Sequence, residues 1–238
     1  MPHLILVRHG QSEWNQQKRF TGWVDIDLTA QGKLEACKAG ELIKEQNLNI
    51  DYLFSSLQLR SINTMKLIIN TLRIKDISVK AWQLNERSYG ALTGLNKDEM
   101  KKKYGEKKIR EFRRSWSVKP EPLSRNNPYH PINIKTYKDL PLENIPDTES
   151  LEDTYNRVVL FYKKNIENRI CENKNILVSA HGNSIRALCK YLFKLNETKI
   201  ELLEIPTGNP LMINMNLENK ISECKYLDKN RAKDLITY

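Results

Sequence analysis

The chain has 238 residues, of which 39% are hydrophobic and 29% charged, with 9 glycines and 9 prolines. This length suits a single α/β domain over residues 1–238, and the composition excludes a disordered or low-complexity chain. The formal net charge of +10 leaves three partners open: a nucleic acid, an anionic membrane surface or a small anionic substrate.

The N-terminal run and the cysteines bear on the cellular compartment. The apolar run at residues 4–7 is too short for a signal sequence or a membrane span. The cysteines lie far apart and include no C-x-x-C pair, so we expect buried thiols in a reducing, cytoplasmic setting rather than disulfides or metal ligands. They are Cys37, Cys171, Cys189 and Cys224.

Strands and helices are predicted to alternate in the first part of the chain. Fully apolar runs indicate buried strands, and apolar residues recurring at helical spacing indicate amphipathic helices. The pattern predicts a strand at 4–7, a helix capped by Thr29, a strand at 52–54, a helix over 62–72 and a weaker strand over 79–84.

The middle of the chain is basic and loses its periodicity. Between Lys97 and Arg125 there are eleven Lys or Arg residues against five Asp or Glu, a balance of +6. We expect a helix over 97–116 and then an irregular segment over 117–147, which contains six prolines. Such long loops in compact domains are usually functional, so we expect the region of about 97–147 to cover the active site. A solvated basic helix face is the plainer interpretation of the charge.

Regular structure returns in the last third of the chain. We predict a helix from Leu151 to about residue 166, capped by Ser150 and Asp153, a buried strand at 175–180, and a helix containing Ile185 and Leu188. Alternating strands and helices predict an α/β fold with a mostly parallel central sheet and helices on both faces. Ligands of such folds bind at the carboxyl ends of the strands.

Two predicted buried strands end in the same way, in Arg8-His9-Gly10 and Ala180-His181-Gly182. Both histidines are therefore expected to face one crevice, where the glycines permit close approach of a ligand. The chain has no H-E-x-x-H or His/Cys cluster for a metal and no G-x-S-x-G turn for a serine nucleophile. A neutral imidazole beside a planar guanidinium suits phosphoryl transfer instead. His3 and His130 are expected at the surface.

The sequence resembles the histidine phosphatase superfamily and, within it, the cofactor-dependent phosphoglycerate mutase family. The R-H-G triplet alone indicates only the superfamily, but a set of motifs follows the family's order over nearly the whole chain. These are LVRHGQSEWN at 6–15, RFTGW at 19–23, LNERSYGAL at 84–92, GLNK at 94–97, RR at 113–114, TESL at 148–151, AHGNS at 180–184 and IPTG at 205–208.

The resemblance implies a role for each residue of a catalytic group. His9 would be the phosphorylated nucleophile, and Glu86 the general acid and base with a pKa raised in a partly dry site. His181, Arg8 and Arg60 would stabilise the phosphoryl group in flight.

The resemblance also implies a ligand, a donor and an assembly state. The ligands would be 3-phosphoglycerate and 2-phosphoglycerate, and 2,3-bisphosphoglycerate would prime the histidine without a metal. A homodimer that binds neither nucleic acid nor membrane is expected. The implied substrate-binding residues are Arg8, His9, Gly10, Gln11, Ser12, Glu13, Trp14, Asn15, Thr21, Gly22, Arg60, Glu86, Arg87, Ser88, Tyr89, Lys97, Arg113, Arg114, Gly182 and Asn183.

The sequence also departs from the family's pattern. Gln11 stands where glutamate is common, the 126–147 segment is shortened and less acidic, and the tail over 227–238 is brief and lacks an Ala-rich ending. Weak closure by that tail would divert phosphohistidine toward hydrolysis. Three alternatives remain: a phosphatase of the superfamily, a bisphosphoglycerate synthase, and a protein of another class, either a catalytically inactive scaffold or a basic nucleic-acid-binding protein. Ser12, which is typically glycine in the synthases, favours the mutase over the second.

Overall fold

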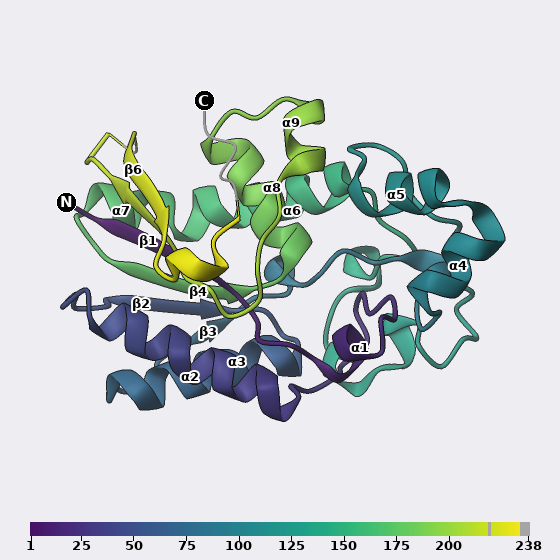
Figure 1. Cartoon of the computed structure of the whole chain (residues 1–238), viewed down its shortest axis with the longest axis horizontal. Coiled ribbons are helices and arrows are strands. Elements are labelled where there is room, and N and C mark those ends of the chain that lie inside the picture. The colour runs from purple at the N-terminus through teal and green to yellow at the C-terminus, as the bar shows by residue number, and fades with distance from the viewer. Residues whose placement is uncertain (219, 234–238) are drawn as a thin grey trace.

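In the computed structural model, which describes residues 1–218 and 220–233, six strands form one mixed sheet in the order β3-β2-β4-β1-β5-β6 (Figure 1). The first four strands are parallel to one another, whereas β5 runs antiparallel to both β1 and β6. Their bounds are β1 His3–Arg8, β2 Tyr52–Ser55, β3 Val79–Lys80, β4 Ile176–Ala180, β5 Leu211–Met215 and β6 Ile221–Tyr226.

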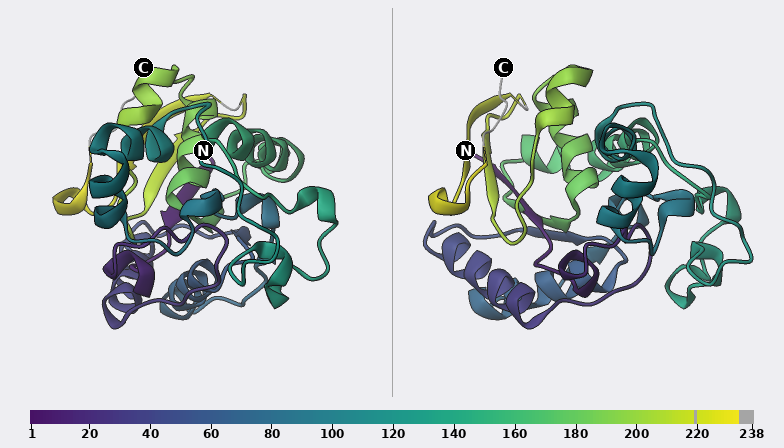
Figure 2. Two further views of the ribbon diagram at one scale, coloured as in Figure 1. Left: turned by 90° about the vertical axis from the view of Figure 1, so that its right-hand side faces the viewer. Right: turned by 45° about the vertical axis from the view of Figure 1, so that its right-hand side comes forward.

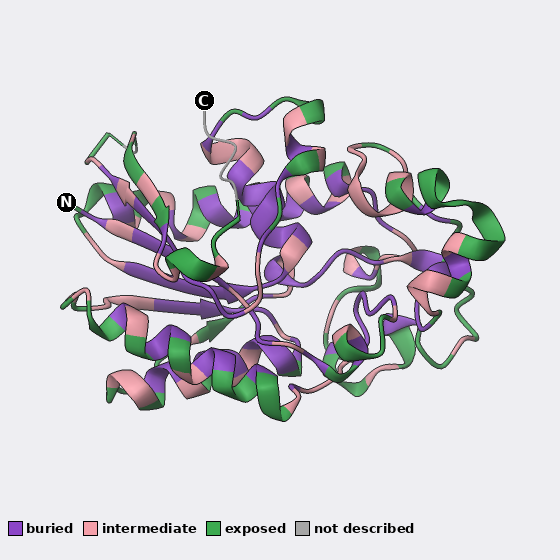
Figure 3. Ribbon diagram, in the orientation of Figure 1, coloured by how far each residue is buried: buried purple, intermediate pink, exposed green. Residues whose placement is uncertain are grey.

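Helices cover both faces of the sheet, as predicted (Figure 1). On one face α2 (Ala30–Lys44) packs beside α3 (Leu59–Leu72), and on the other α6 (Leu151–Asn165) packs beside α8 (Gly182–Leu192). Side chains alternate across a strand, so Leu4 and Leu6 of β1 join the core beneath α6 and α8. Ile5 and Val7 join the core beneath α2 and α3. All four are buried (Figure 3). Two-sided burial explains why this strand is apolar throughout.

The predicted helix caps are confirmed. Thr29 caps α2 through a hydrogen bond from the Gly32 N–H to its hydroxyl. Ser150 and Asp153 form a reciprocal capping box at the start of α6. These local side-chain bonds satisfy helix N–H groups without tertiary help, which is why the sequence reveals them.

The basic region differs from the single helix predicted over 97–116. It contains α4 (Lys97–Tyr104) and α5 (Glu106–Arg114), separated at Gly105, whose φ of 83° ends the first helix. The irregular segment after α5 contains 3-10 turns at Pro131–Asn133, Lys135–Tyr137 and Leu142–Asn144. Both parts gather at one end of the molecule, toward which β1 runs (Figures 1 and 2).

Other elements were shortened or missed. The strand expected over 79–84 is two residues long and is followed by a 3-10 turn, and β5 and β6 were not predicted. The remaining elements are α1 (Glu13–Gln16), α7 (Glu167–Cys171), α9 (Glu197–Leu202) and 3-10 turns at Trp82–Leu84, Gly90–Leu92 and Lys229–Arg231. Among the described residues, no helix is long and apolar enough to cross a membrane.

Two burial predictions were wrong. His130 is fully buried, because its Nδ1 accepts the Ile132 N–H and its Nε2 lies 3.0 Å from an Asp147 carboxylate oxygen. Of the four free cysteines only Cys189 is buried, while Cys171 is exposed on α7.

The last five residues of the tail, 234–238, lie outside the described residues, so the expectation about its ending stays a prediction.

Candidate active site

A polar cavity of about 580 Å³ opens at the carboxyl ends of β1 and β4. The loops that follow these strands, the basic helices and the segment before β5 all contribute to its wall. The lining residues are Arg8, His9, Asn15, Thr21, Gly22, Arg60, Glu86, Tyr89, Lys97, Arg113, Arg114, Gly182, Asn183, Arg186, Glu204, Ile205, Pro206, Thr207, Arg231 and Lys233. The two histidine motifs therefore meet at one site, as their positions after buried strands predicted.

His9 is held with one ring nitrogen available. Its Nδ1 lies 2.7 Å from the carbonyl oxygen of Gly10, and because a carbonyl only accepts, Nδ1 carries the proton. The lone pair is then on Nε2, which is the nucleophilic nitrogen. Burial, together with the positive charges of Arg60 and Arg8, holds the pKa of His9 well below its ordinary value. The neutral, nucleophilic form is thus favoured.

His181 lies directly beside His9, with ring centroids 5.0 Å apart. It is completely buried and is not part of the cavity lining. Its Nε2 lies 2.8 Å from the Ser56 hydroxyl, while Nδ1 has no hydrogen-bond partner among the described residues. Burial, with Arg60 next in size, also holds the pKa of His181 well below its ordinary value.

The glycines beside the two histidines have different tasks. A Cβ on Gly10 would lie 2.1 Å from the carbonyl oxygen of Gly32, so the chain requires glycine where the His9 loop crosses α2. The close approach at Gly10 is therefore to the backbone of α2, and Gly10 is not among the residues that line the cavity, so its contact with a ligand stays a prediction. A Cβ on Gly182, which lines the cavity, would meet only the Arg8 side chain at ordinary contact distance.

Arg8 and Arg60 place positive charge beside His9. The Arg8 Nη1 donates to the Ile205 carbonyl at 2.7 Å, and Arg60 donates to the carbonyls of Val24 and Gly22, each at 2.9 Å. Burial lowers the pKa of both guanidinium groups. Within the described residues neither forms an ion pair with a carboxylate, although burying an unpaired charge is costly. An anion in the cavity would supply the missing partner.

Glu86 faces the same space. Its Oε1 accepts the backbone N–H groups of Arg87, at 2.7 Å, and of Asn183, at 3.3 Å. These bonds fix the carboxylate through one oxygen and leave Oε2 for a proton transfer. The residue is nearly buried and lines the cavity, as a general acid and base requires.

A second group of cations lines the cavity away from His9. Lys97 donates to the Arg19 carbonyl at 2.8 Å, and burial lowers its pKa to about 8. Arg114 donates to the Leu203 carbonyl at 3.1 Å and pairs with Glu204 at 3.0 Å. Arg113 also lines the wall. The basic region thus delivers charge to the cavity itself, in addition to its solvated face.

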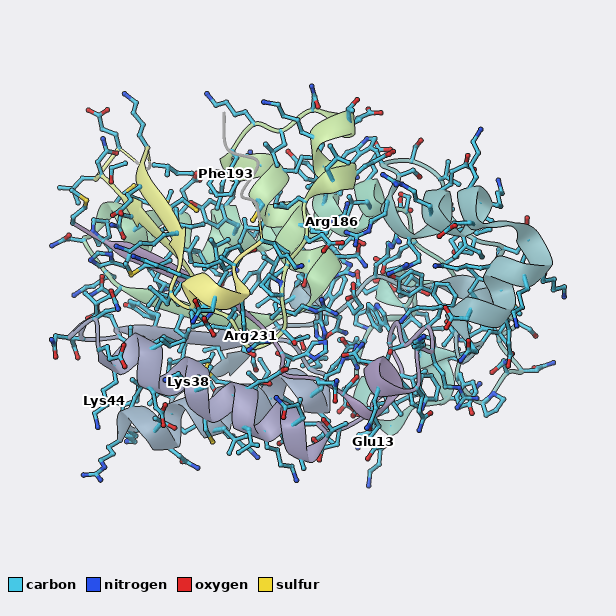
Figure 4. The ribbon with its side chains drawn as sticks, in the orientation of Figure 1. Glu13, Lys38, Lys44, Arg186, Phe193 and Arg231 are labelled. Carbon is cyan, nitrogen blue, oxygen red and sulfur yellow. The ribbon has the colours of Figure 1, made fainter. Side chains whose placement is uncertain are left out.

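Several residues expected to bind substrate lie behind the cavity wall. Ser12 caps α1, Trp14 packs edge-on against Tyr129, and Glu13 is exposed on α1 (Figure 4). Arg87 is buried beneath the ring of Tyr89, with its guanidinium carbon 4.9 Å from the ring centroid. The expected residues outside the lining are Gly10, Gln11, Ser12, Glu13, Trp14, Arg87, Ser88 and His181.

Other lining residues were missed by sequence reasoning. Arg186 lies on α8 three residues after Asn183, one helical turn away on the same face, and that spacing was the available signal. Thr207 is brought in by bridging to Arg8, next to the hydrogen bond from the Gly208 N–H to the Arg8 carbonyl. Arg231 reaches the wall from the C-terminal segment and donates to the Thr207 carbonyl at 2.7 Å. Thr207 belongs to the IPTG motif of the sequence, which gave it no role, and nothing local in the sequence places Arg231 at the wall.

The chemistry of the site calls for anions rather than a metal ion. Within residues 1–218 and 220–233, no group of three or more His, Cys, Asp or Glu side chains is placed to hold a metal. The wall instead offers an imidazole nucleophile, a carboxylate and several cations. Fixed cations of this kind stabilise the charge that spreads over the oxygens of a transferring phosphoryl group.

Both site histidines are expected to stay neutral at mildly acidic pH. An ordinary histidine with a pKa of about 6.5 takes up a proton as the pH falls through that value, but burial and the nearby arginines oppose the charged ring here. In ¹⁵N NMR spectra of the ligand-free protein, the ring signals of His9 and His181 should remain those of neutral imidazole at pH values where an ordinary histidine is already protonated. A titration midpoint at or above 6.5 for either ring would contradict this.

Comparison with known proteins places the chain in a family. The model of the histidine phosphatase superfamily (branch 1) matches residues 4–130 and 127–221. A 2,3-bisphosphoglycerate-dependent phosphoglycerate mutase of Pelagibacter ubique is 69% identical over 238 residues, covering 100% of both chains. A mutase of the same name from Maricaulis maris is 44% identical over 237 residues, covering 99% of this chain and 98% of the relative.

Solved structures agree on the fold. A mycobacterial glucosyl-3-phosphoglycerate phosphatase, 18% identical, superposes with a TM-score of 0.69 over 95% of this chain and 97% of its own. A structure described as mycobacterial hydrolase 1, 17% identical, gives a TM-score of 0.71 with the same coverage of 95% and 97%. The fold, the paired histidine motifs and the full-length relatives agree, and the chain belongs to the 2,3-bisphosphoglycerate-dependent phosphoglycerate mutase family of the histidine phosphatase superfamily.

Proposed function

We propose that this chain is a glycolytic phosphoglycerate mutase that interconverts 3-phosphoglycerate and 2-phosphoglycerate through a phosphohistidine at His9. The observation that carries the proposal is the His9 ring, whose Nδ1 donates to a backbone carbonyl, while Nε2 has no hydrogen bond to any described residue and lies beside Arg8 and Arg60. 2,3-Bisphosphoglycerate is the phosphoryl donor that primes this nitrogen. The full-length relatives carry that dependence in their names.

The reaction is two transfers between nitrogen and oxygen. The 2-hydroxyl of 3-phosphoglycerate attacks the phosphohistidine phosphorus, the P–N bond breaks, and Glu86 takes the hydroxyl proton. The resulting 2,3-bisphosphoglycerate turns around in the cavity. Nε2 of His9 then attacks its 3-phosphoryl group, Glu86 returns the proton to the leaving oxygen, and 2-phosphoglycerate departs. Arg8 and Arg60 stabilise the charge on the transferring group from the cavity wall. His181, which is buried beside His9, joins them by exchanging the Ser56 hydroxyl for a phosphoryl oxygen.

The remaining lining residues hold the ligand in each orientation. Asn15, Thr21, Gly22 and Asn183 supply neutral hydrogen bonds, and the backbone around residues 10–14 and 87–88 supports them from behind the wall. Tyr89, Lys97, Arg113 and Arg114 grip the carboxylate or phosphate at the end that is not reacting. Removing one partner of a buried, hydrogen-bonded charge pair costs about 2–5 kcal/mol of binding free energy, so the loss of one of these cations is expected to weaken ligand binding strongly.

A phosphatase of the same superfamily is the second candidate function. It would use the same histidine and arginines but release phosphate to water, and some solved structures of this fold are phosphatases. The distal cations favour the mutase, because holding the intermediate bisphosphoglycerate requires charge at both ends of the cavity. A bisphosphoglycerate synthase would also use that charge, and product analysis separates it from the other two.

The test supplies 3-phosphoglycerate with and without 2,3-bisphosphoglycerate, in EDTA, and measures 2-phosphoglycerate, bisphosphoglycerate and free phosphate. Conversion to 2-phosphoglycerate that depends on the bisphosphate and persists in EDTA is expected. Phosphate as the main product would establish the phosphatase. In a separate reaction that supplies 1,3-bisphosphoglycerate as the phosphoryl donor, net formation of 2,3-bisphosphoglycerate as the main product would establish the synthase. Activity restored only by added Mg²⁺ or Mn²⁺ would contradict the mechanism.

The chain is further proposed to act in the cytoplasm as a single catalytic domain that forms a homodimer. The support for the dimer is β3, an edge strand whose Val79 is 54% exposed next to an equally exposed Ile77. A bare edge strand with apolar side chains is a ready surface for pairing with a second copy. Light scattering should give twice the chain mass of 27.9 kDa, and a monomer would contradict the proposal.

A further inference from the structure

Arg186 is a buried cation in the wall of the cavity. It projects from α8 (Figure 4) and is 3% exposed. Burial, followed by the positive charges of Arg114 and Arg87, lowers its pKa to about 9. None of the ion pairs found among the described residues involves Arg186, and its Nε has no hydrogen-bond partner there. A charge buried in this way costs stability unless something else in the site requires it.

One arm of the Arg186 guanidinium orients Asn183. Nη1 donates to the Asn183 Oδ1 at 3.0 Å, and since an arginine only donates, this bond fixes which end of the amide faces it. The amide nitrogen is then directed at the Tyr89 hydroxyl, 3.0 Å away. The backbone N–H of Asn183 also binds Glu86. This arm therefore fixes the groups that surround the proton-transfer carboxylate.

The other arm reaches the basic region. Nη2 donates to the carbonyl of Arg114, at 3.4 Å, and to the carbonyl of Ile200 in α9. The Arg114 side chain in turn donates to the Leu203 carbonyl just beyond α9. A single planar guanidinium thus joins the end of α5, α9 and the first turn of α8. Because the guanidinium is rigid, it fixes the distances between these three helices.

We propose that Arg186 is a positioning residue for phosphoryl transfer, which sets the distance between the Asn183–Glu86 side of the cavity and the Arg113–Arg114 side. The inference rests on the proposed mutase function. The bound bisphosphate compensates the positive charge of Arg186. The residue therefore stabilises the protein with bisphosphate bound and destabilises the ligand-free protein. Its loss lets the distal grip shift relative to the proton-transfer group, and small displacements of this kind lower turnover strongly.

The test compares Arg186→Gln, which removes the charge, and Arg186→Lys, which keeps the charge but loses the fork, with Arg169→Lys. Arg169 also donates to a backbone carbonyl but lies on α7, where it packs over Tyr52 at the amino end of β2. Mutase kcat per folded molecule should fall about tenfold or more in both Arg186 variants, because reacting groups are displaced, and should not change in the control. The Tm of Arg186→Gln should equal or exceed that of the wild type, because a desolvated charge is gone.

Two further measurements separate positioning from a structural role. Added 2,3-bisphosphoglycerate should raise the Tm of Arg186→Gln less than that of the wild type. In an Asn183→Ala background, Arg186→Gln should cost less kcat than in the wild type, because the group it orients is already absent. Unchanged kcat per folded molecule in both Arg186 variants, or equal losses in the two backgrounds, would overturn the proposal. A wild-type chain that forms no 2-phosphoglycerate would instead overturn the mutase function.

Discussion

Replacing His9 with alanine is expected to abolish phosphoryl transfer, with kcat falling by a factor of about 10⁴ or more. The reason is structural as well as chemical. His181, 5.0 Å away between ring centroids, cannot substitute, because it is completely buried and its Nε2 is engaged with Ser56. With labelled 2,3-bisphosphoglycerate, the wild-type chain should form an adduct on His9 that is labile in acid and stable in base.

The matched control is His3→Ala. His3 is at the opposite end of β1, where its Nδ1 lies 2.7 Å from the Asn214 side chain, and it does not line the cavity. That variant should take up label and turn over at the wild-type rate. Label retained by His9→Ala would show that another residue carries the phosphoryl group and would remove the basis of the proposed mechanism.

Replacing Arg113 and Arg114 together with alanine is expected to convert the mutase toward a slow phosphatase. Both residues occupy the last turn of α5 and line the cavity. Binding energy from the remote end of the ligand retains the intermediate bisphosphate while it turns and favours closure against water. The loss of each guanidinium should cost about 2–5 kcal/mol of binding free energy. The double replacement should therefore lower mutase kcat/KM by a factor of about 10³ or more. Phosphate released per His9 phosphorylation should rise.

The control removes the same charge from the solvated face. Lys102 and Lys107 are exposed on α4 and α5, and neither lines the cavity. Lys102→Ala with Lys107→Ala lowers the net charge by the same two units, so it reports long-range attraction of the anionic substrate, which salt screens. A small, salt-dependent change in kcat/KM is expected. If the two double variants behaved alike, or the Arg113–Arg114 variant kept its mutase rate, the distal grip would be disproved.

The sequence alone determined those parts of the protein that rest on local interactions. The two-sided burial of β1 and β4 makes each strand apolar throughout, and the caps of α2 and α6 use side chains within three residues of the helix start. Because parallel strands end at the same edge, two histidines that each follow such a strand had to meet there. The strand pattern therefore predicted that the two histidine motifs share one site, whereas the role of His9 as the phosphorylated nucleophile came from the resemblance to the family.

The tertiary structure decided what depends on contacts between distant segments. The break at Gly105 divides a basic stretch whose composition suits one helix, and it is this break that turns α5 and its last two arginines toward the cavity. The strands β5 and β6 were not predicted, and each depends on a pairing partner: β5 pairs with β1, which lies far away in the chain, and β6 pairs with β5. In the same way, His130 is buried by its contacts with Ile132 and Asp147. The irregular sequence around it has no periodicity from which this burial could be predicted.

The division is sharpest at the wall of the active site. Which of the expected residues reach the cavity, and which support it from behind, is set by packing against segments that are distant in the chain, as Gly32 is to Gly10. Arg186 appears in the sequence as one more helical arginine, and its burial between Asn183 and Arg114 exists only after α5, α8 and α9 have come together. Sequence spacing encodes the local face of a helix, whereas desolvation and hydrogen-bond partners are properties of the folded assembly.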